Sequence, residues 1–116
     1  MRSDSLDSLF QALAHPARRK VLDLLREAPG MSVKALSSHF DMSRIGVMKH
    51  IKVLEACELV LSTKDGRTRS LFFNPIPIQQ IYDRWTDQYS SFFSSQLVDL
   101  KTRVESAAQA KGNQSA

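Results

Sequence analysis

The feature that most constrains how this 116-residue chain can fold is a pair of short amphipathic helices with a tight break between them. Ser32 opens the first helix, and the chain breaks at Asp41-Met42. Ser43 can cap a second helix that runs to about Cys57, because its hydroxyl can accept from an N–H of the first turn. The second helix has one apolar stripe, at spacing i, i+4, i+7: Val47, Ile51 and Leu54. Two short helices joined by a tight turn form the helix-turn-helix pattern.

The second helix also carries side chains suited to a nucleic acid. Opposite its apolar stripe lie basic residues, and its N-terminal turn contains a glycine, so that a backbone or a base could approach closely there. We therefore predict that this helix enters the major groove of double-stranded DNA. The residues assigned to the contact are Ser43, Arg44, Ile45, Gly46, Met48, Lys49, His50 and Lys52. For His50, a packed histidine at the edge of the helix is the alternative to a phosphate contact.

The segment that follows predicts a β-hairpin with a basic tip. Val60–Lys64 and Arg67–Phe73 have the composition of strands, and Asp65-Gly66 between them is a two-residue turn signal. This turn would pair Lys64 with Arg67, Ser62 with Arg69, and Val60 with Leu71, with all six on one face. We expect Lys64, Arg67 and Arg69 to lie along a phosphate backbone; a solvated hairpin with chance positive charge is the alternative.

Helical patterns lie on both sides of the segment that contains the helix-turn-helix and the hairpin. The last one runs from Pro77 to about Ser106, and a helix of about 28 residues is about 42 Å long. A compact chain of this size has a radius of gyration of roughly 13 Å, so the helix would expose its apolar stripe, which is typical of an interface. We predict a two-fold dimer, with an apolar effector pocket between the subunits as the alternative use of the aromatic residues. The interface residues are Leu6, Leu9, Phe10, Ile81, Trp85, Tyr89, Phe92, Phe93, Leu97, Leu100 and Val104.

The predicted fold is mainly α with a small β-hairpin: a winged helix-turn-helix of about five helices plus a two-stranded antiparallel wing. A single domain is expected over residues 1–106, with terminal dimerisation helices at 4–13 and 77–106. Residues 107–116 are small and polar, which predicts a disordered tail.

Composition narrows the function. The chain has 16 Lys+Arg against 12 Asp+Glu and a net charge of +4, which suits a polyanionic partner. One cysteine excludes an internal disulfide framework and a Cys-rich zinc site. There is no apolar run of roughly 18 residues and no apolar core behind the N-terminus, so we expect a cytoplasmic protein with no membrane contact. There is no Gly-rich phosphate loop and no nucleophile–base constellation, so no enzymatic activity and no cofactor are expected.

From about Leu9 to Val104 the sequence resembles the ArsR-type (arsenic-repressor-like) winged-helix transcriptional regulators. The resemblance rests on ALAHPARRKVLDLL, MSVKALSSHFDMSRIGVMKHIKVLEACELV and TKDGRTRSLFFNP. It implies a homodimeric repressor that binds a palindromic operator, with five helices and a two-stranded wing. It also implies that the DNA-reading helix contains Ser43, Arg44, Gly46, Met48, Lys49 and His50.

The chain departs from the family at three places near this helix. Ile45-Gly46 stands where the family often has Pro-Ala, and Met48 where it commonly has Ser, which leaves the operator sequence open. Glu58 stands where the family favours Gly. A left-handed backbone at Glu58 would cost on the order of 1 kcal/mol, unless the helix ends differently.

The family's sensing sites are also altered. Metal-sensing members carry a Cys-x-Cys pair where this chain has Ser32 and Lys34, and neither of these supplies a thiolate. The histidines of this chain all lie outside the last helix, where a second family site uses His and carboxylates. No metal site of the thiolate type is therefore expected. Cys57 is interpreted as core packing, with a redox switch as the alternative.

Together these observations predict a sequence-specific regulator that binds double-stranded DNA as a homodimer. A further possible partner is a small-molecule effector, which the sequence does not identify. The alternatives are a winged-helix module that binds proteins, or a repressor switched through Cys57 or by a hydrophobic effector.

Overall fold

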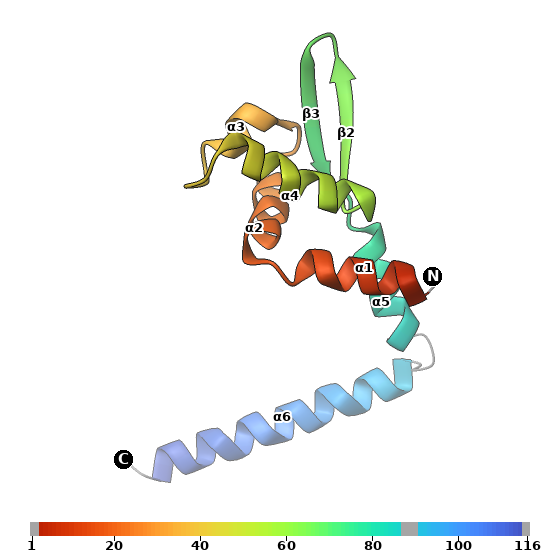
Figure 1. The fold of residues 1–116 in the computed structure, drawn as a ribbon. Helices are drawn as coiled ribbons and strands as arrows, with labels where there is room; N and C mark the ends of the chain where they lie inside the picture. Colours follow the sequence, from red (N-terminus) through yellow and green to blue (C-terminus); the bar gives the residue numbers. More distant parts are fainter. Residues whose placement is uncertain (1–2, 87–90, 115–116) are drawn as a thin grey trace. The chain divides into compact units, whose positions relative to one another are not determined.

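The computed structural model describes residues 3–86 and 91–114 (Figure 1). The chain forms two compact units, residues 1–81 and 82–116, where the sequence predicts one domain over 1–106. Within the described ranges, no helix is both long enough and apolar enough to cross a membrane.

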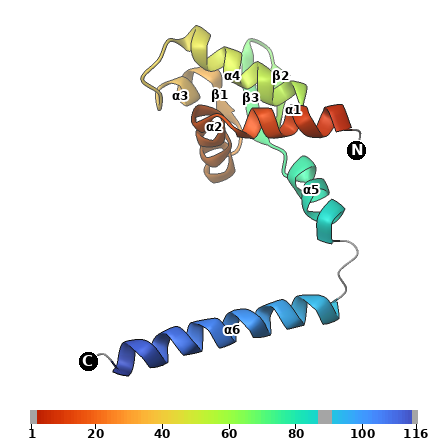
Figure 2. The same ribbon diagram turned by 60° about the horizontal axis from the view of Figure 1, so that its bottom comes forward.

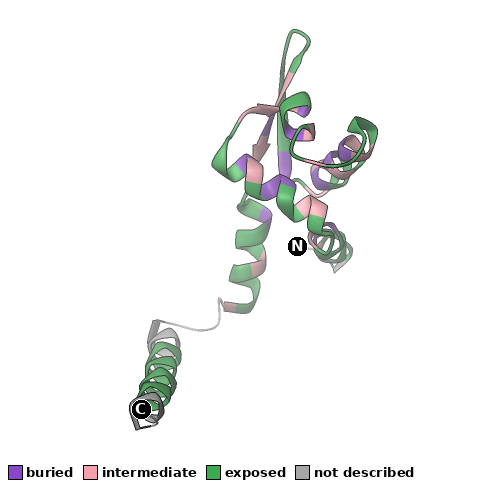
Figure 3. Cartoon of the chain, turned by 90° about the vertical axis from the view of Figure 1, so that its left-hand side faces the viewer, coloured by how far each residue is buried: buried purple, intermediate pink, exposed green. Residues whose placement is uncertain are grey.

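Four helices and a small sheet build the first unit. The helices are α1 (Ser3–Leu13), α2 (Pro16–Glu27), α3 (Val33–Ser37) and α4 (Arg44–Ala56). Figures 1 and 2 show α2, α3 and α4 gathered together, and Figure 1 shows the β2–β3 hairpin extending away from them. In Figure 3 the buried residues lie on the helices and at the base of the sheet, whereas the hairpin tip is exposed. The buried core is Leu9, Ala12, Val21, Leu22, Leu25, Val33, Leu36, Val47, Ile51, Leu54, Leu59, Val60 and Leu71.

Local capping fixes where three of these helices begin. His15 caps α2 by accepting from the Ala17 N–H at Nδ1 (3.1 Å), and Pro16 takes the first helical position, where it needs no hydrogen-bond acceptor. Ser32 caps α3 by accepting from Ala35 (3.0 Å), and Ser43 caps α4 by accepting from Gly46 (3.1 Å). The predicted break between α3 and α4, the start of a helix at Ser32 and the cap at Ser43 are therefore confirmed.

The sheet has three antiparallel strands in the order β1-β3-β2, not the two that the sequence predicts. They are β1 (Met31–Ser32), β2 (Val60–Asp65) and β3 (Thr68–Phe73). Strand β1 pairs Met31 with Leu71 and Ser32 with Ser70. A two-residue strand shows no alternation of polar and apolar residues, so the sequence pattern contains no signal for it.

The predicted register of the hairpin is wrong by two residues. Asp65 pairs with Thr68, so the turn residues are Gly66-Arg67 and not Asp65-Gly66. Gly66 has φ of 62°, the sign that a type II′ turn requires at its first central residue. Val60 therefore lies opposite Phe73, Ser62 opposite Leu71, and Lys64 opposite Arg69, while Arg67 leaves the strand for the turn.

The predicted single C-terminal helix is two helices among the described residues: α5 (Ile76–Thr86) and α6 (Ser91–Gln114). Because α6 continues to Gln114, the residues from Ala107 that were expected to form a disordered tail are helical up to that position. Asn74 connects α5 to the end of α4. Its side chain donates to the Glu58 carbonyl (2.9 Å) and accepts from Ile76 N–H (3.2 Å), and its own N–H donates to the Leu59 carbonyl (2.9 Å).

Candidate nucleic-acid interface

Helix α4, the second helix of the helix-turn-helix and called the recognition helix below, is divided into a buried stripe and an exposed face. Val47, Ile51 and Leu54 are each at most 1% exposed, which confirms the predicted inward stripe. The other face exposes Arg44, Ile45, Lys49 and Lys52, and Ile45 is 68% exposed. Because the apolar stripe fixes the rotation of the helix on the core, the basic residues are held facing solvent.

Two residues assigned to DNA also contact the protein itself. Met48 is half-buried and packs against the core, so only part of its side chain faces solvent. A Cβ placed on Gly46 would lie 3.4 Å from Ser43 Oγ and 3.6 Å from Met42 Sδ. These contacts lie at the lower edge of the ordinary range, so Gly46 lets the capping serine and Met42 pack closely against the first turn of α4.

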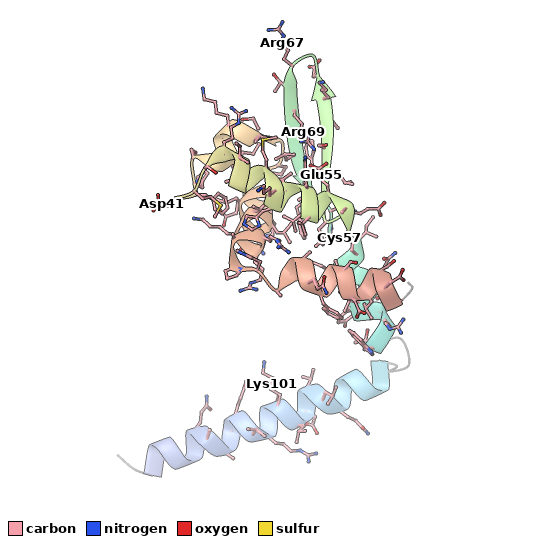
Figure 4. All side chains as sticks on the ribbon, viewed as in Figure 1. Asp41, Glu55, Cys57, Arg67, Arg69 and Lys101 are labelled. Atoms are coloured by element: carbon pink, nitrogen blue, oxygen red, sulfur yellow. The ribbon has the colours of Figure 1, made fainter. Side chains whose placement is uncertain are left out.

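Two of the three predicted basic residues of the wing are exposed. Lys64 lies on β2, and Arg67 lies at the tip of the hairpin, as Figure 4 shows. Arg69 lies on β3, and its guanidinium forms an ion pair with Glu55 of α4. The Arg69 and Glu55 side chains are 34% and 27% exposed, so this contact between β3 and α4 is half-buried.

His50 lies in a cluster between α4 and the start of α2. Its Nδ1 accepts from Arg18 Nε (3.3 Å), and its ring centroid is 4.5 Å from that of His15. Burial and the nearby His15 and Arg18 lower the pKa of His50 below its usual 6.5, because each disfavours the protonated ring. These contacts favour the packed-histidine interpretation. The sequence could not show them, because His50 and Arg18 are 32 positions apart.

Three consecutive basic residues on α2 have structural contacts that sequence reasoning missed. Arg18 donates to the Gln11 carbonyl (3.1 Å) and Arg19 to the Leu13 carbonyl (2.7 Å), both near the C-terminal end of α1. Cations are stabilised at a helix C-terminus, so these side chains fix the corner between α1 and α2. Lys20 donates to the His39 carbonyl (2.6 Å) and lies 4.7 Å from the centre of the Phe40 ring. It thereby holds the segment between α3 and α4 on α2.

At the C-terminal end of α4, Glu58 adopts the left-handed backbone, which is one of the two possibilities that the sequence left open. Glu58 has φ of 64° and is the single non-glycine residue with positive φ in the described ranges. Leu59 N–H donates to the Leu54 carbonyl (2.9 Å) and Glu58 N–H to the Glu55 carbonyl (3.0 Å), which is the Schellman pattern. Leu54 and Leu59 are both 0% exposed, so the apolar contact that accompanies this motif is present.

Cys57 is half-buried beside this helix end. Its Sγ donates to the carbonyls of Val53 and Leu54 (3.5 Å each), and burial raises the pKa of the thiol above 9.0. It lines a cavity of about 460 Å³ formed by residues of α1, the end of α4 and α5. Since the thiolate is the reactive form, a raised pKa makes Cys57 a poor redox centre. In the part of the chain that the structure describes, no three His, Cys, Asp or Glu side chains are grouped so as to hold a metal ion.

The predicted dimer residues whose side chains the structure describes fall into three groups. Leu9 is 1% exposed within the core of its own chain, so its assignment to an interface is corrected. Leu6 and Ile81 are half-buried, and Ile81 packs on the same core. Five are exposed by 43% to 61%: Phe10, Trp85, Leu97, Leu100 and Val104. The predictions for Tyr89, Phe92 and Phe93 lie outside the residues whose side chains the structure describes.

Comparison with known proteins places this arrangement in a family. A helix-turn-helix domain model matches residues 13–63. The chain is 33% identical over 87 residues to the uncharacterized HTH-type transcriptional regulator YuzN of Bacillus subtilis (strain 168), covering 70% of this chain and 95% of YuzN. It is 29% identical over 62 residues to the transcriptional repressor SdpR of the same organism, covering 53% of this chain and 68% of SdpR.

Among solved structures, an ArsR family transcriptional regulator superposes with a TM-score of 0.68 at 34% identity, covering 76% of this chain and 90% of that one. This superposition agrees with the resemblance to ArsR-type regulators that the sequence of the recognition helix and the wing indicates. The chain therefore belongs to the ArsR family of helix-turn-helix transcriptional regulators.

Proposed function

We propose that this DNA-binding regulator is a homodimeric repressor that inserts α4 of each subunit into the major groove of a palindromic operator. The observation that carries the proposal is the division of α4 into a buried apolar stripe and an exposed basic face. A helix held in this way can present side chains to base edges while its flanks meet phosphates. Lys64 and Arg67 of the wing extend the basic surface beyond the helix.

Each residue then has a role set by its position. Arg44, Lys49 and Lys52 supply charge to the groove, and the exposed Ile45 supplies apolar contact of the kind that suits a thymine methyl. Ser43 and Gly46 form the first turn, which approaches the DNA backbone. Met48 contributes the part of its side chain that the core leaves exposed.

The proposed dimer rests on apolar side chains of α1, α5 and α6. Five of these side chains are exposed in the single chain: Phe10, Trp85, Leu97, Leu100 and Val104. Packing against a second copy of the chain would bury exposed apolar surface of this kind. A two-fold pair would present two recognition helices to successive major grooves, about 34 Å apart. The name of the relative SdpR supports repression as the outcome.

The test is to sequence the DNA fragments that the purified full chain selects from genomic DNA, and then to measure affinity for the selected duplex. Lys49→Ala should weaken binding about tenfold. Lys101→Ala, which removes the same charge from an exposed site on α6, should leave affinity within about twofold. Recovery of a palindrome supports the proposal, and a failure to enrich any duplex would overturn it.

The dimer is tested separately by sedimentation of the full chain. Replacing both Leu97 and Leu100 with Glu should produce a monomer that binds half-sites weakly, whereas Thr102→Glu, on the opposite side of α6, should stay dimeric. A monomeric wild-type chain at micromolar concentration would refute the homodimer and leave DNA binding by α4 standing.

Absence of enzymatic activity, of a thiolate metal site and of a cofactor, and a cytoplasmic location, stay predictions. The raised pKa of Cys57 counts against the redox alternative.

A further inference from the structure

The ion pair between Arg69 and Glu55 connects strand β3 of the wing to the recognition helix α4. The Lys101–Glu105 and Arg103–Asp99 ion pairs lie within α6, at i, i+4 spacing, whereas the Arg69–Glu55 pair connects a strand to a helix. Figure 4 shows the two side chains meeting between α4 and β3. Both are about one-third exposed or less, so solvent screens this pair less than the pairs on α6.

The hairpin register places a second positive charge beside Arg69, and Glu55 offsets it. Lys64 lies directly opposite Arg69 across β2 and β3, and like charges at such positions repel. Glu55 offsets the charge of Arg69 and holds its guanidinium against α4. Lys64 and the tip residue Arg67 remain exposed on the wing.

We propose that Arg69 is a positioning residue and not a phosphate ligand: Glu55 holds it in the DNA complex, so that it fixes the wing on α4 while Lys64 and Arg67 meet the backbone. This inference rests on the proposed DNA binding, and it revises the prediction that all three basic residues of the wing contact phosphates. The inference therefore assigns different roles to Arg67 and Arg69, although they lie two positions apart in the sequence.

The two roles differ in their dependence on salt. Each phosphate that a protein neutralises adds about 0.9 to the slope of log affinity against log salt concentration. A phosphate ligand therefore changes the slope when it is removed, whereas a positioning residue changes affinity at every salt concentration and leaves the slope alone. A purely structural effect on folding does not produce this difference.

The experiment measures fluorescence anisotropy of a labelled 30-base-pair duplex with full-length variants, over a series of sodium chloride concentrations. Arg67→Gln should reduce the slope by about 0.9. Arg69→Gln should leave the slope unchanged and weaken binding by up to about fivefold. Lys101→Gln, which removes the same charge from α6, is the control that should change neither quantity.

Replacing Glu55 keeps the inference testable if Arg69→Gln does not fold, as judged by circular dichroism. Glu55→Gln releases Arg69, so the slope should steepen by about 0.9, and adding Arg69→Gln should return it to the wild-type value. The charge-swapped chain E55K/R69E should bind more tightly than R69E alone, because it replaces two facing carboxylates with an opposite-charge pair.

An equal loss of slope in Arg67→Gln and Arg69→Gln would overturn the inference, as would a slope that Glu55→Gln leaves unchanged. Either result leaves the proposed function intact. If the wild-type chain shows no salt-dependent affinity for the duplex, the proposed function itself has failed.

Discussion

Arg18 donates from Nε to Nδ1 of His50 at 3.3 Å, which joins α2 to the recognition helix through a neutral histidine. The ring can accept at Nδ1 only when that nitrogen carries no proton. His15 from the start of α2 and the Arg18 guanidinium both face the ring, and together with burial they lower its pKa. The protonation state of His50 therefore bears on how α4 sits on α2.

We expect the free energy of unfolding to fall as the pH decreases from 6.5 through the lowered pKa of His50. In that window the unfolded histidine binds a proton and the folded one does not, so acid favours unfolding. The stabilisation is fully present above 6.5. Urea denaturation between about pH 5 and pH 7.5 should show a shallower pH dependence for His50→Gln than for wild type. The exposed His39 provides the control, and His39→Gln should follow wild type; equal curves for all three chains would refute the prediction.

The left-handed Glu58 predicts a stabilising substitution. Glu58→Gly should raise the free energy of unfolding by about 1 kcal/mol, because glycine adopts positive φ without the Cβ clash. Thermal unfolding measures this as a rise of a few degrees in Tm. Glu58→Ala removes the carboxylate but keeps a Cβ, so a comparable gain in that variant would show that charge and not backbone strain was responsible.

The Lys20 side chain predicts a loss of stability. Lys20→Met keeps most of the aliphatic stem but removes the hydrogen bond to the His39 carbonyl and the cation over Phe40, so we expect a loss of about 1–2 kcal/mol. Chemical denaturation measures it. Lys34→Met makes the same charge change at an exposed site on α3 and should stay within about 0.5 kcal/mol of wild type.

Neighbouring residues on α1 should respond differently to truncation. Leu9→Ala removes a buried side chain and should cost about 2–5 kcal/mol of folding free energy. Phe10 is 43% exposed in the single chain, so Phe10→Ala should cost less at concentrations where the chain is monomeric. The comparison requires denaturation curves at two protein concentrations, and an equal loss for both variants in the monomer would contradict the burial pattern.

The sequence predicted the features that depend on local signals. The start of α3 at Ser32, the cap at Ser43 and the inward stripe of α4 were recognisable, because each is set by residues within two turns of helix. The left-handed Glu58 was one of two possibilities that the family resemblance left open. The register of the wing was missed, because Gly66 fits either of two adjacent turn positions and only the strand pairing selects between them.

Contacts between distant residues lay beyond sequence reasoning. The contacts of Arg18, Lys20 and Arg69 depend on how α2, α4 and the wing pack, and a charge pattern cannot distinguish a cation held by the protein from one that faces solvent. Strand β1 was missed since it acquires strand geometry only by pairing with β3.

Asn74 determines how the start of α5 is held. Its amide and backbone bind the carbonyls of Glu58 and Leu59 and the first N–H of α5, so three hydrogen bonds hold the start of α5 at the end of α4. Replacing Asn74 would therefore release this connection without changing a residue of either helix.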